Sequence, residues 1–402
     1  MLSPSIRYQG GPGDLRSLFI RLCAWLQRQP VAFIDRDPRA IGAVLASSAH
    51  KGRFLEERIA CPAWEPIRSV ESVDGPEWEA LSSTFRTVFR RLEWRERLPA
   101  AVAGALATVV AGDDGLVDAQ VVSRVTASAL HRVVFGVEAP AEVSDLLYRA
   151  SVEWRKEIAV KGAGDRSVKD AFVAWLDAAL RRSRWADLLA CEEHGPRLLS
   201  AIAQPLLISP QINVADIFVT LFAELERDPD RMAQVRSWAE DDEKALLNGA
   251  VMEAIRLGHP FPVLERWLPR DVEAAGSRFS RGTQVFMMMD ALQQEEEFRP
   301  ERWIGPRSSN PYADLPFGSG PRMCTGRPLA ELLMVELLRG LLTTVPPNRL
   351  RPAEGNPYSG RANDGKDDLE SILHQARVFG RVLLQSMGLG LRGEGRCPFH
   401  SA

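Results

Sequence analysis

A glycine-rich loop near the carboxyl-terminal end of the chain delivers one cysteine to the start of a predicted helix. The loop reads Phe317-Gly318-Ser319-Gly320-Pro321-Arg322-Met323-Cys324-Thr325-Gly326. Its glycines permit tight turns and a close approach of the backbone. A helix that begins near Gly326 points its first N–H groups and the positive end of its dipole at the Cys324 sulfur. These conditions favour a thiolate, which is the form in which cysteine binds metal ions.

Cys324 has no cysteine close to it in the sequence, so the loop predicts a metal ligand rather than a redox pair. A thiolate of this kind is suited to be an axial ligand of haem iron, where its electron push favours O–O cleavage. Backbone N–H groups around the sulfur would tune the iron, and Phe317 would shield the sulfur from water. Arg322 can turn away from the sulfur and meet a haem propionate.

Two motifs upstream of the loop strengthen this interpretation. Glu253 and Arg256 are three residues apart on a predicted helix, where they share a face and can pair. The segment Pro300-Glu301-Arg302-Trp303 lies between that helix and the cysteine loop. The order ExxR, PERW and FxxGxRxCxG, continued by RxLAE, resembles the signature of the cytochrome P-450 family. The resemblance covers roughly residues 15 to 345 and is most secure from 245 to 342.

The resemblance implies a single, mainly α domain of triangular-prism shape with small β sheets. It places haem b between a helix at about 196–226 and the helix after Cys324. Residues 1–70 and 260–290 would contribute the small β lobe of this 1–402 domain, whereas 345–402 form an atypical tail without the family's closing hairpin. Glu253, Arg256 and Arg302 would form a buried charge triad that is structural and not catalytic.

The resemblance also suggests which residues hold the cofactor. Cys324 would bind the metal, with Phe317, Gly318 and Gly326 forming the loop around it. Arg322 and Arg266 would bind the haem propionates. Trp78 is a further candidate, although many relatives place an arginine four residues after this tryptophan and Ser82 stands there in this chain. Packing in the core is an equally good interpretation of Trp78.

The central helix departs from the family pattern where monooxygenases carry AGx(D/E)T, whose acid and threonine help to protonate iron-bound dioxygen. The corresponding residues are Ser209-Pro210-Gln211-Ile212-Asn213. Pro210 should kink the helix there because it has no N–H group. Asn213 can hydrogen-bond a distal oxygen or a water, and Gln211 is a second candidate, but an amide is a poor proton source. Asp216, the nearest acid, is expected to face a polar contact outside the pocket.

Three functions are therefore compatible with the sequence. The first is a monooxygenase that inserts one atom of O2 into a small or medium organic molecule, such as a secondary metabolite, terpenoid or fatty acid. The second is an enzyme that uses or rearranges peroxides and needs neither O2 nor an electron donor. The third is a haem-binding protein with little oxidase activity. Candidate pocket residues are the segment after Cys61, Leu206 to Asn213, Val263 and Leu264.

Composition is that of a globular protein, with 45% hydrophobic residues and a net charge of −3. This charge gives no reason to expect a nucleic acid as partner. The five cysteines (Cys23, Cys61, Cys191, Cys324 and Cys397) are few and scattered, which favours free thiols and a cytoplasmic location. The early apolar stretch from Leu15 to Leu26 is too short for a bilayer span, so no membrane anchor is expected. A monomer is expected.

An external electron donor follows from the lack of a nucleotide-binding motif in the chain. If O2 is reduced, electrons would come from a ferredoxin or flavodoxin that docks on the cysteine side of the haem. A basic helix predicted from Trp78 to Leu98 would supply the docking surface. Its arginines are Arg86, Arg90, Arg91, Arg95 and Arg97, joined by Arg327. A zinc site from the two CxxH pairs, Cys191 with His194 and Cys397 with His400, is disfavoured by their separation.

Overall fold

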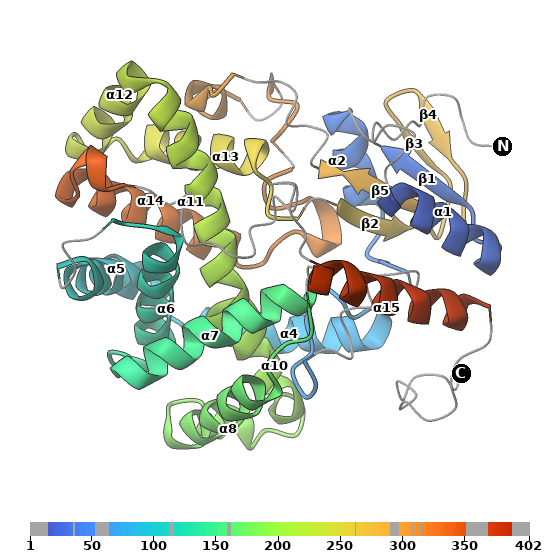
Figure 1. Ribbon diagram of the computed structural model, residues 1–402, viewed down its shortest axis with the longest axis horizontal. Helices are drawn as coiled ribbons and strands as arrows, with labels where there is room; N and C mark the ends of the chain where they lie inside the picture. The colour runs from blue at the N-terminus through green and yellow to red at the C-terminus, as the bar shows by residue number, and fades with distance from the viewer. Residues whose placement is uncertain are drawn as a thin grey trace.

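Helices make up most of the described chain, and short strands gather at one end (Figure 1). The structure is a computed structural model that describes residues 15–34, 37–52, 64–111, 116–158, 162–261, 263–289, 297–306, 309–313, 315–350 and 369–387. The helices before the central one are α1 (Leu15–Gln27), α2 (Pro38–Ser47), α4 (Gly75–Arg91), α5 (Trp94–Ala111), α6 (Ala119–Phe135), α7 (Ala141–Ile158), α8 (Arg166–Arg182) and α9 (Ala186–Leu189). The mainly helical fold with small sheets, expected from the sequence, is confirmed.

The central helix runs from Gly195 to Arg227 and is interrupted once. It consists of α10 (Gly195–Ile202), the π-helical turn η1 (Ala203–Ile208) and α11 (Ser209–Arg227). In η1 the Ser209 N–H donates to the Gln204 carbonyl, five residues back. The π-helical turn ends just before Pro210, whose missing N–H removes one bond from the regular ladder. The structure thus has a π-helical turn directly before the residues at which the sequence predicted a kink.

This helix is long and apolar enough to cross a membrane, but 72% of its most apolar window is buried inside the protein. It packs against α6, α7 and α13 (Lys244–Leu257), and its apolar side chains belong to the main hydrophobic core. The helices that follow are α12 (Pro229–Glu240), α13, α14 (Arg327–Thr344) and α15 (Leu369–Ser386). Short 3₁₀ turns are η3 (Pro300–Trp303), η5 (Gly320–Arg322) and η6 (Pro347–Arg349).

The main sheet brings the beginning of the chain together with its later part. Its order is β1 (Val31–Ile34), β5 (Gln284–Met288) and β2 (Val263–Trp267). β1 is parallel to β5, whereas β2 is antiparallel to it. All five residues of β5 are buried, as expected of a strand covered on both faces.

A second, two-stranded sheet is formed by strands that the sequence did not indicate individually. It joins β3 (Val272–Ala274) to β4 (Ser277–Phe279). The connecting residues Ala275 and Gly276 both have positive φ angles, 48° and 77°. A two-residue hairpin turn needs this backbone, but Ala-Gly is a weaker signal for it than Asn-Gly.

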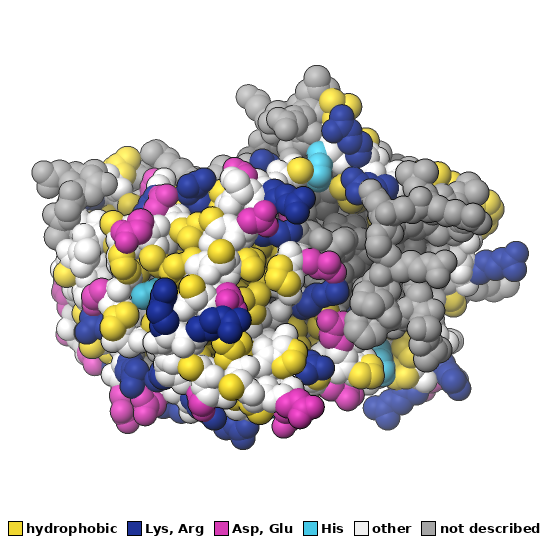
Figure 2. Space-filling view, turned by 90° about the horizontal axis from the view of Figure 1, so that it is seen from below, with side chains coloured by type: hydrophobic (Ala, Val, Ile, Leu, Met, Phe, Trp, Pro, Cys, Tyr) yellow, Lys and Arg dark blue, Asp and Glu magenta, His cyan; other side chains and the backbone are white. Residues whose placement is uncertain are grey.

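The basic segment from Trp78 to Leu98, predicted as one helix, is two helices. α4 ends at Arg91 and α5 begins at Trp94, with Glu93 at a φ of 50° between them. This left-handed residue ends α4 and lets both helices bury apolar faces in the main core. On the face seen in Figure 2, side chains of both charge signs are interspersed with apolar ones over the described residues.

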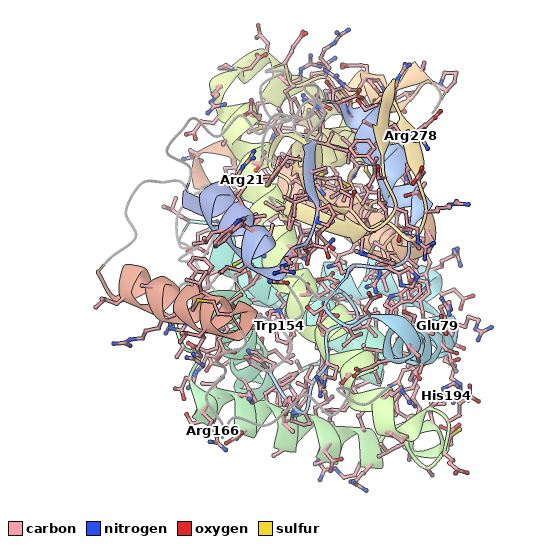
Figure 3. All side chains as sticks on the ribbon, turned by 90° about the vertical axis from the view of Figure 1, so that its right-hand side faces the viewer. Arg21, Glu79, Trp154, Arg166, His194 and Arg278 are labelled. Atoms are coloured by element: carbon pink, nitrogen blue, oxygen red, sulfur yellow. The ribbon has the colours of Figure 1, made fainter. Side chains whose placement is uncertain are left out.

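The tail beyond residue 345 contributes a helix to the fold. α15 packs against α1, and the two helices lie side by side along one margin of the molecule (Figure 3). Val382 of α15 is buried in a small core with Ile20 and Cys23 of α1 and with Phe286 of β5. The polar segment from Arg351 to Asp368 lies outside the described residues.

Candidate functional site

The cysteine loop is built from short backbone hydrogen bonds that bring Cys324 back to the start of the loop. The Cys324 N–H donates to the Phe317 carbonyl at 2.9 Å, and the Arg327 N–H donates to the Cys324 carbonyl at 3.2 Å. The N–H groups of Gly326 and Arg327 also point at the Cys324 sulfur. The expected delivery of a sulfur to the first turn of α14 is thus present in the geometry.

Two glycines of the loop adopt the left-handed backbone, and one of them is also crowded. Gly318 and Gly320 both have a φ of 70°. A Cβ atom on Gly318 would meet nothing within 4 Å, whereas one on Gly320 would lie 2.5 Å from the Ala46 Cα and 2.9 Å from the Leu45 carbonyl oxygen. Gly320 therefore allows the cysteine loop to touch α2.

Alanine at these two positions separates backbone strain from crowding. We expect Gly318→Ala to lower the free energy of unfolding by about 1 kcal/mol, from the left-handed backbone alone. Gly320→Ala carries the same strain and in addition displaces α2, so its loss should be larger by about 1–3 kcal/mol. Urea unfolding of both variants measures the difference. Equal losses would mean that the contact between Gly320 and α2 contributes nothing.

Cys324 is an exposed residue, although protein surrounds its thiol closely. Burial raises the pKa of its thiol to about 11, with a smaller contribution from the Glu71 charge, while the two N–H groups on the sulfur oppose the shift. A thiol with this pKa keeps its proton at neutral pH until a cation replaces it.

The predicted charge triad is confirmed and lies at the centre of a larger network. Glu253 and Arg256 are fully buried and pair at 2.8 Å, and Arg302 Nε lies 3.2 Å from the same carboxylate. Trp303 Nε1 donates to Glu253 at 2.8 Å, and both guanidinium groups lie over the ring of Tyr312. The carboxylate thus joins α13 to η3, which fixes the chain that leads to the cysteine loop.

One face of the central helix keeps accessible surface while its neighbours are buried. Between residues 201 and 218 the side chains that are not buried are Pro205, Ser209, Pro210 and Asn213. Their spacing of four, one and three residues puts them on one side of the helix. Asn213 Nδ2 donates to Ser209 Oγ at 3.0 Å. Asn213 was predicted to face the distal side, and Ser209, a hydroxyl one turn earlier, is the polar partner that the sequence reasoning did not assign.

The structure turns Gln211 away from this face, which corrects its proposed contact with distal oxygen. Its side chain is fully buried and donates to the carbonyls of Leu147, at 3.2 Å, and Leu207. The reason is helical geometry, because Gln211 is two residues before Asn213 and therefore points to the opposite side, toward α7. Asp216 is occupied as expected: its carboxylate accepts from Arg155 Nη2 at 2.6 Å, and both side chains are buried.

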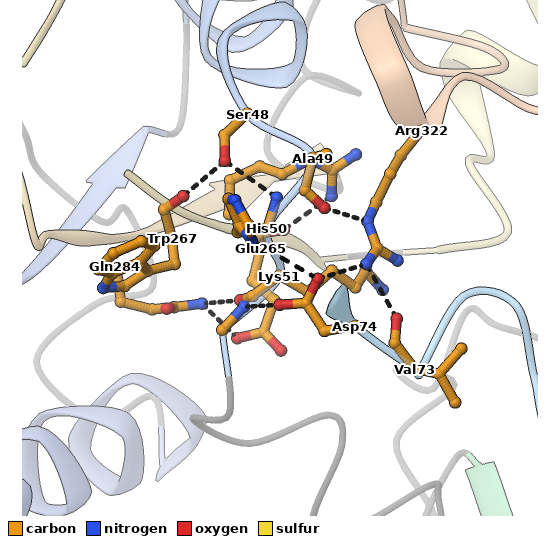
Figure 4. Close-up of polar contacts among 12 residues, drawn as sticks. Ser48, Ala49, His50, Lys51, Val73, Asp74, Glu265, Trp267, Gln284 and Arg322 are labelled. Carbon is orange, nitrogen blue, oxygen red and sulfur yellow. Dashed lines mark hydrogen bonds and ion pairs between the residues drawn. The ribbon is translucent and has the colours of Figure 1, made fainter. Parts of the chain in front are cut away.

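Arg322 and Trp78, both predicted near the propionates, lie against each other. The Arg322 guanidinium is 4.6 Å from the centre of the Trp78 ring. Arg322 Nη2 also pairs with Asp74 at 2.7 Å and donates to the Val73 carbonyl at 2.9 Å, and only 4% of its side chain is exposed (Figure 4). The Arg322 guanidinium therefore donates hydrogen bonds to acceptors within the protein.

The remaining predicted cofactor residues have the following places. Arg266 is buried in β2, and its Nη1 donates to the Glu265 carbonyl at 2.7 Å. Phe317 is half-buried against the main core, with the Arg327 guanidinium 5.6 Å from its ring. Gly326 caps α14, and a Cβ on it would lie 3.8 Å from the Cys324 sulfur. Val263 and Leu264 are partly buried, and the segment directly after Cys61 lies outside the described residues.

No zinc site forms among the described residues, since no group of three or more metal-binding side chains occurs there. Cys397 and His400 lie outside the described residues. His194 lies at the edge of the molecule in Figure 3, and its Nδ1 is 3.2 Å from Thr84 Oγ1. His131 is buried beside Phe135, and desolvation lowers the pKa of its imidazole. These side chains have structural partners.

The residues on the thiol side fit a haem. A single sulfur on an exposed cysteine, flanked by two N–H donors and held by a glycine loop, is the donor set that a haem-thiolate iron takes. The open face of the central helix carries only small or neutral side chains, so a flat apolar ring would meet no buried charge there. Cys324 is therefore the residue that would hold the iron.

Comparison with known proteins gives one consistent result. A family model described as cytochrome P-450 matches residues 229–344. Probable cytochrome P-450 12b2, mitochondrial, of Drosophila melanogaster is 28% identical over 184 residues, which cover 37% of this chain and 34% of the relative. Putative cytochrome P-450 137 of Mycobacterium tuberculosis is 29% identical over 152 residues, covering 35% of this chain and 32% of the relative. The chain thus spans about a third of the length of these curated relatives.

The likeness to solved structures extends over more of the chain. A crystal structure of a six-coordinated cytochrome P-450 from Thermus thermophilus superimposes with a TM-score of 0.61 and 20% identity, covering 82% of this chain and 90% of that one. A structure of a mutant P-450 EryK in complex with erythromycin B gives a TM-score of 0.54 at 19% identity, covering 82% of this chain and 89% of that one. At these identities the likeness shows the fold.

Proposed function

Since this chain belongs to the cytochrome P-450 family, we propose that it is a haem-thiolate monooxygenase that inserts one oxygen atom from O2 into a small or medium organic molecule. The observation that carries the proposal is the position of Cys324, an exposed residue of the glycine loop whose sulfur has two backbone N–H donors. Secondary metabolites, terpenoids and fatty acids are the substrate classes that we propose.

The chain's own residues would have different roles on the two sides of the cofactor. When bound, haem would supply the redox chemistry, and a thiolate ligand favours O–O cleavage. Cys324 would lose its proton and hold the iron, and the N–H groups of Gly326 and Arg327 would limit the charge on its sulfur. The charge triad of Glu253, Arg256 and Arg302 would hold the chain that leads to the cysteine loop.

On the distal side, the described residues of the open helix face offer neutral hydrogen-bonding groups and no acid. Asn213 and Ser209 can orient a water molecule, and the serine hydroxyl can pass a proton that it receives from water. Ile212 is apolar, and Asp216 is held by Arg155, so neither supplies protons at this face. We therefore assign proton delivery to water held by the Ser209–Asn213 pair.

The same observation favours a second candidate, an enzyme that uses or rearranges organic peroxides. A peroxide already contains the O–O bond, so it needs neither external electrons nor the protons that reduce O2. The decisive experiment compares the purified haem protein with O2 plus a ferredoxin system against an organic hydroperoxide alone. Product only with the first supports the monooxygenase, and product only with the second supports the peroxide enzyme. If neither oxidant gives product although the thiolate spectrum is intact, the result supports the third function, a haem-binding protein with little oxidase activity.

Removing the Asn213 amide tests the assigned proton path. We expect Asn213→Ala to lower O2-dependent product formation by about 100-fold, the lower end of what a positioned proton relay contributes. Activity with hydroperoxide should change much less. Steady-state turnover with both oxidants measures this, with Asn348→Ala, an exposed asparagine in η6, as the matched control. Equal loss with both oxidants would contradict a role in proton delivery.

We further propose that a ferredoxin or flavodoxin delivers the electrons in the cytoplasm. The support is three exposed arginines on α4 and at the start of α5, namely Arg86, Arg90 and Arg95. Arg91, Arg97 and Arg327 are already paired with Asp187, Glu93 and Glu331, respectively. The cytoplasmic location rests on the few, scattered cysteines.

A further inference from the structure

The first helix, α1, holds large apolar side chains on its outer side. Ile20 and Cys23 are buried in the small core that α1 shares with β5 and α15. Trp25, by contrast, is 74% exposed, and Leu22 is 42% exposed. These two residues are three positions apart and therefore lie on the same side of the helix. The side of α1 that faces away from the core is thus apolar as well.

The last described helix, α15, has a similar outer side. Leu373, Leu384 and the following residue Met387 are exposed, whereas Val382 is buried in the core with α1. Spacings of eleven and three residues place the exposed side chains on one side of the helix. Of the nine large apolar side chains that are exposed among the described residues, five lie on α1, on α15 or directly after α15. Such a grouping marks a contact surface.

The charged side chains beside these apolar ones are basic. Arg28 is exposed directly after α1, and Arg377 and Arg381 are exposed on α15. Arg21 of α1 is also exposed, and its guanidinium lies 4.9 Å from the centre of the Phe33 ring (Figure 3). Since α1 and α15 pack against each other, the arginines and the apolar side chains lie at the same margin of the molecule (Figure 1).

The two segments that form this surface contribute no carboxylate of their own. Residues 15–34 and 371–387 contain neither aspartate nor glutamate. The whole chain has a net charge of −3, so the basic character is local to this surface. Apolar side chains flanked by arginine complement a layer of anionic lipid headgroups, because the apolar groups enter the interface while the guanidinium groups bind phosphate.

A second copy of this chain fits the surface less well. In a two-fold dimer the same patch of both subunits meets, so the arginines of one copy would face a partner surface that is also basic. Like charges brought together in an interface repel each other. Tryptophan beside arginine is instead the composition of the membrane interface, where the indole ring lies at the level of the headgroups.

We propose that α1 and α15 form a peripheral docking surface for membranes that contain anionic lipid. This surface, the α1–α15 face, consists of Leu22, Trp25, Arg28, Arg377 and Leu384. Its apolar side chains enter the headgroup layer, and its arginines bind lipid phosphates. The binding is peripheral, because neither helix is a candidate membrane span and both are anchored in the small core. The proposal does not depend on the oxidase activity.

Sedimentation of the full-length haem protein with lipid vesicles tests the proposal. One set of vesicles is phosphatidylcholine alone, and the other contains equal parts of phosphatidylcholine and phosphatidylglycerol. We expect the wild-type chain to bind the anionic vesicles at least tenfold more strongly, with a preference that decreases as salt is added. Replacing both Arg28 and Arg377 with glutamine should remove most of this preference. A wild-type chain that binds the two kinds of vesicle equally, or neither, would overturn the proposal.

Substitution of the apolar side chains has a matched control. We expect Trp25→Ser combined with Leu384→Ser to weaken binding to anionic vesicles by about tenfold or more, because less apolar surface enters the interface. Val137→Ser should leave binding unchanged, since Val137 is 61% exposed but follows α6. Equal binding by both variants would contradict the proposal. Sedimentation velocity without lipid gives a further check, since a dimer that the Trp25 and Leu384 changes dissociate would assign the face to a second copy.

Fluorescence quenching shows whether Trp25 itself enters the lipid. Trp25→Phe keeps an aromatic side chain on the face, so this variant should still bind anionic vesicles. Brominated phosphatidylcholine in those vesicles quenches tryptophans that reach the acyl chains. We expect quenching in the wild-type chain and its loss in Trp25→Phe, although nine other tryptophans remain in that variant. Equal quenching in both proteins would place the lipid contact elsewhere and overturn the assignment of the α1–α15 face.

Discussion

Replacing Cys324 with serine will abolish both the thiolate-type reduced carbonyl spectrum and the proton that the chain releases when ferric haem binds. The pKa of the Cys324 thiol is raised to about 11, so the sulfur carries its proton at neutral pH before iron displaces it. Haem binding is therefore coupled to the loss of about one proton. As the pH increases toward that pKa, the affinity for haem should rise roughly tenfold for each pH unit. Above it, the thiolate is already formed and the dependence should flatten.

Calorimetry in two buffers of different ionisation enthalpy measures the released proton. Cys191→Ser is the matched control, because Cys191 is a free, partly buried thiol outside the loop. It should retain the spectrum, the proton and the pH dependence. Proton release that persists in Cys324→Ser would place the ligand elsewhere, and a normal thiolate spectrum in that variant would refute the assignment of Cys324.

Replacing Arg256 with alanine will cause the largest loss of stability among single changes in the triad. Glu253 is fully buried, and Arg256 binds both of its oxygens, at 2.8 and 3.1 Å. Removing the guanidinium leaves a buried carboxylate with less compensation, which costs about 3–5 kcal/mol. Because Glu253 also binds Trp303 and the Arg299 N–H, the loss should extend to η3 and the cysteine loop.

Urea unfolding of the haem-loaded protein measures this loss. Arg278→Ala provides the control, since Arg278 pairs with Asp271 at 2.6 Å but is 69% exposed. A surface pair of this kind contributes at most about 1 kcal/mol. A loss in Arg256→Ala no greater than in Arg278→Ala would mean that the buried network does not support the fold.

Most helices and strands could be predicted because their residues repeat with the period of the element. The strands Val31–Ile34 and Val263–Trp267 lie within the segments 1–70 and 260–290, which were expected to form the β lobe. The break at Glu93 was missed, because apolar spacing continues across it while the backbone turns. The helix α15 was missed because it follows a polar segment and buries its face against α1, a partner far away in sequence.

Some site residues could also be predicted from the sequence, whereas others could not. Glu253, Arg256 and Cys324 could be recognised because their spacing along the chain carries the signal. The direction of Gln211 was decided by packing, since the buried Leu147 carbonyl accepts its amide from another helix. The role of Ser209 could not be predicted from the sequence. A serine one turn before Asn213 becomes a candidate partner only once both residues are known to lie on an accessible face of the helix.

The sequence by itself carried the family resemblance, the candidate sulfur ligand and the lack of an acid and a threonine at the predicted distal positions, because these depend on residue identity and local spacing. Only the tertiary structure decided what Arg322 binds. A guanidinium can serve any carboxylate or carbonyl within its reach, and Asp74 reaches it from a segment 248 residues away. Which acceptor a buried charge finds depends on how distant segments pack, and local sequence does not contain that information.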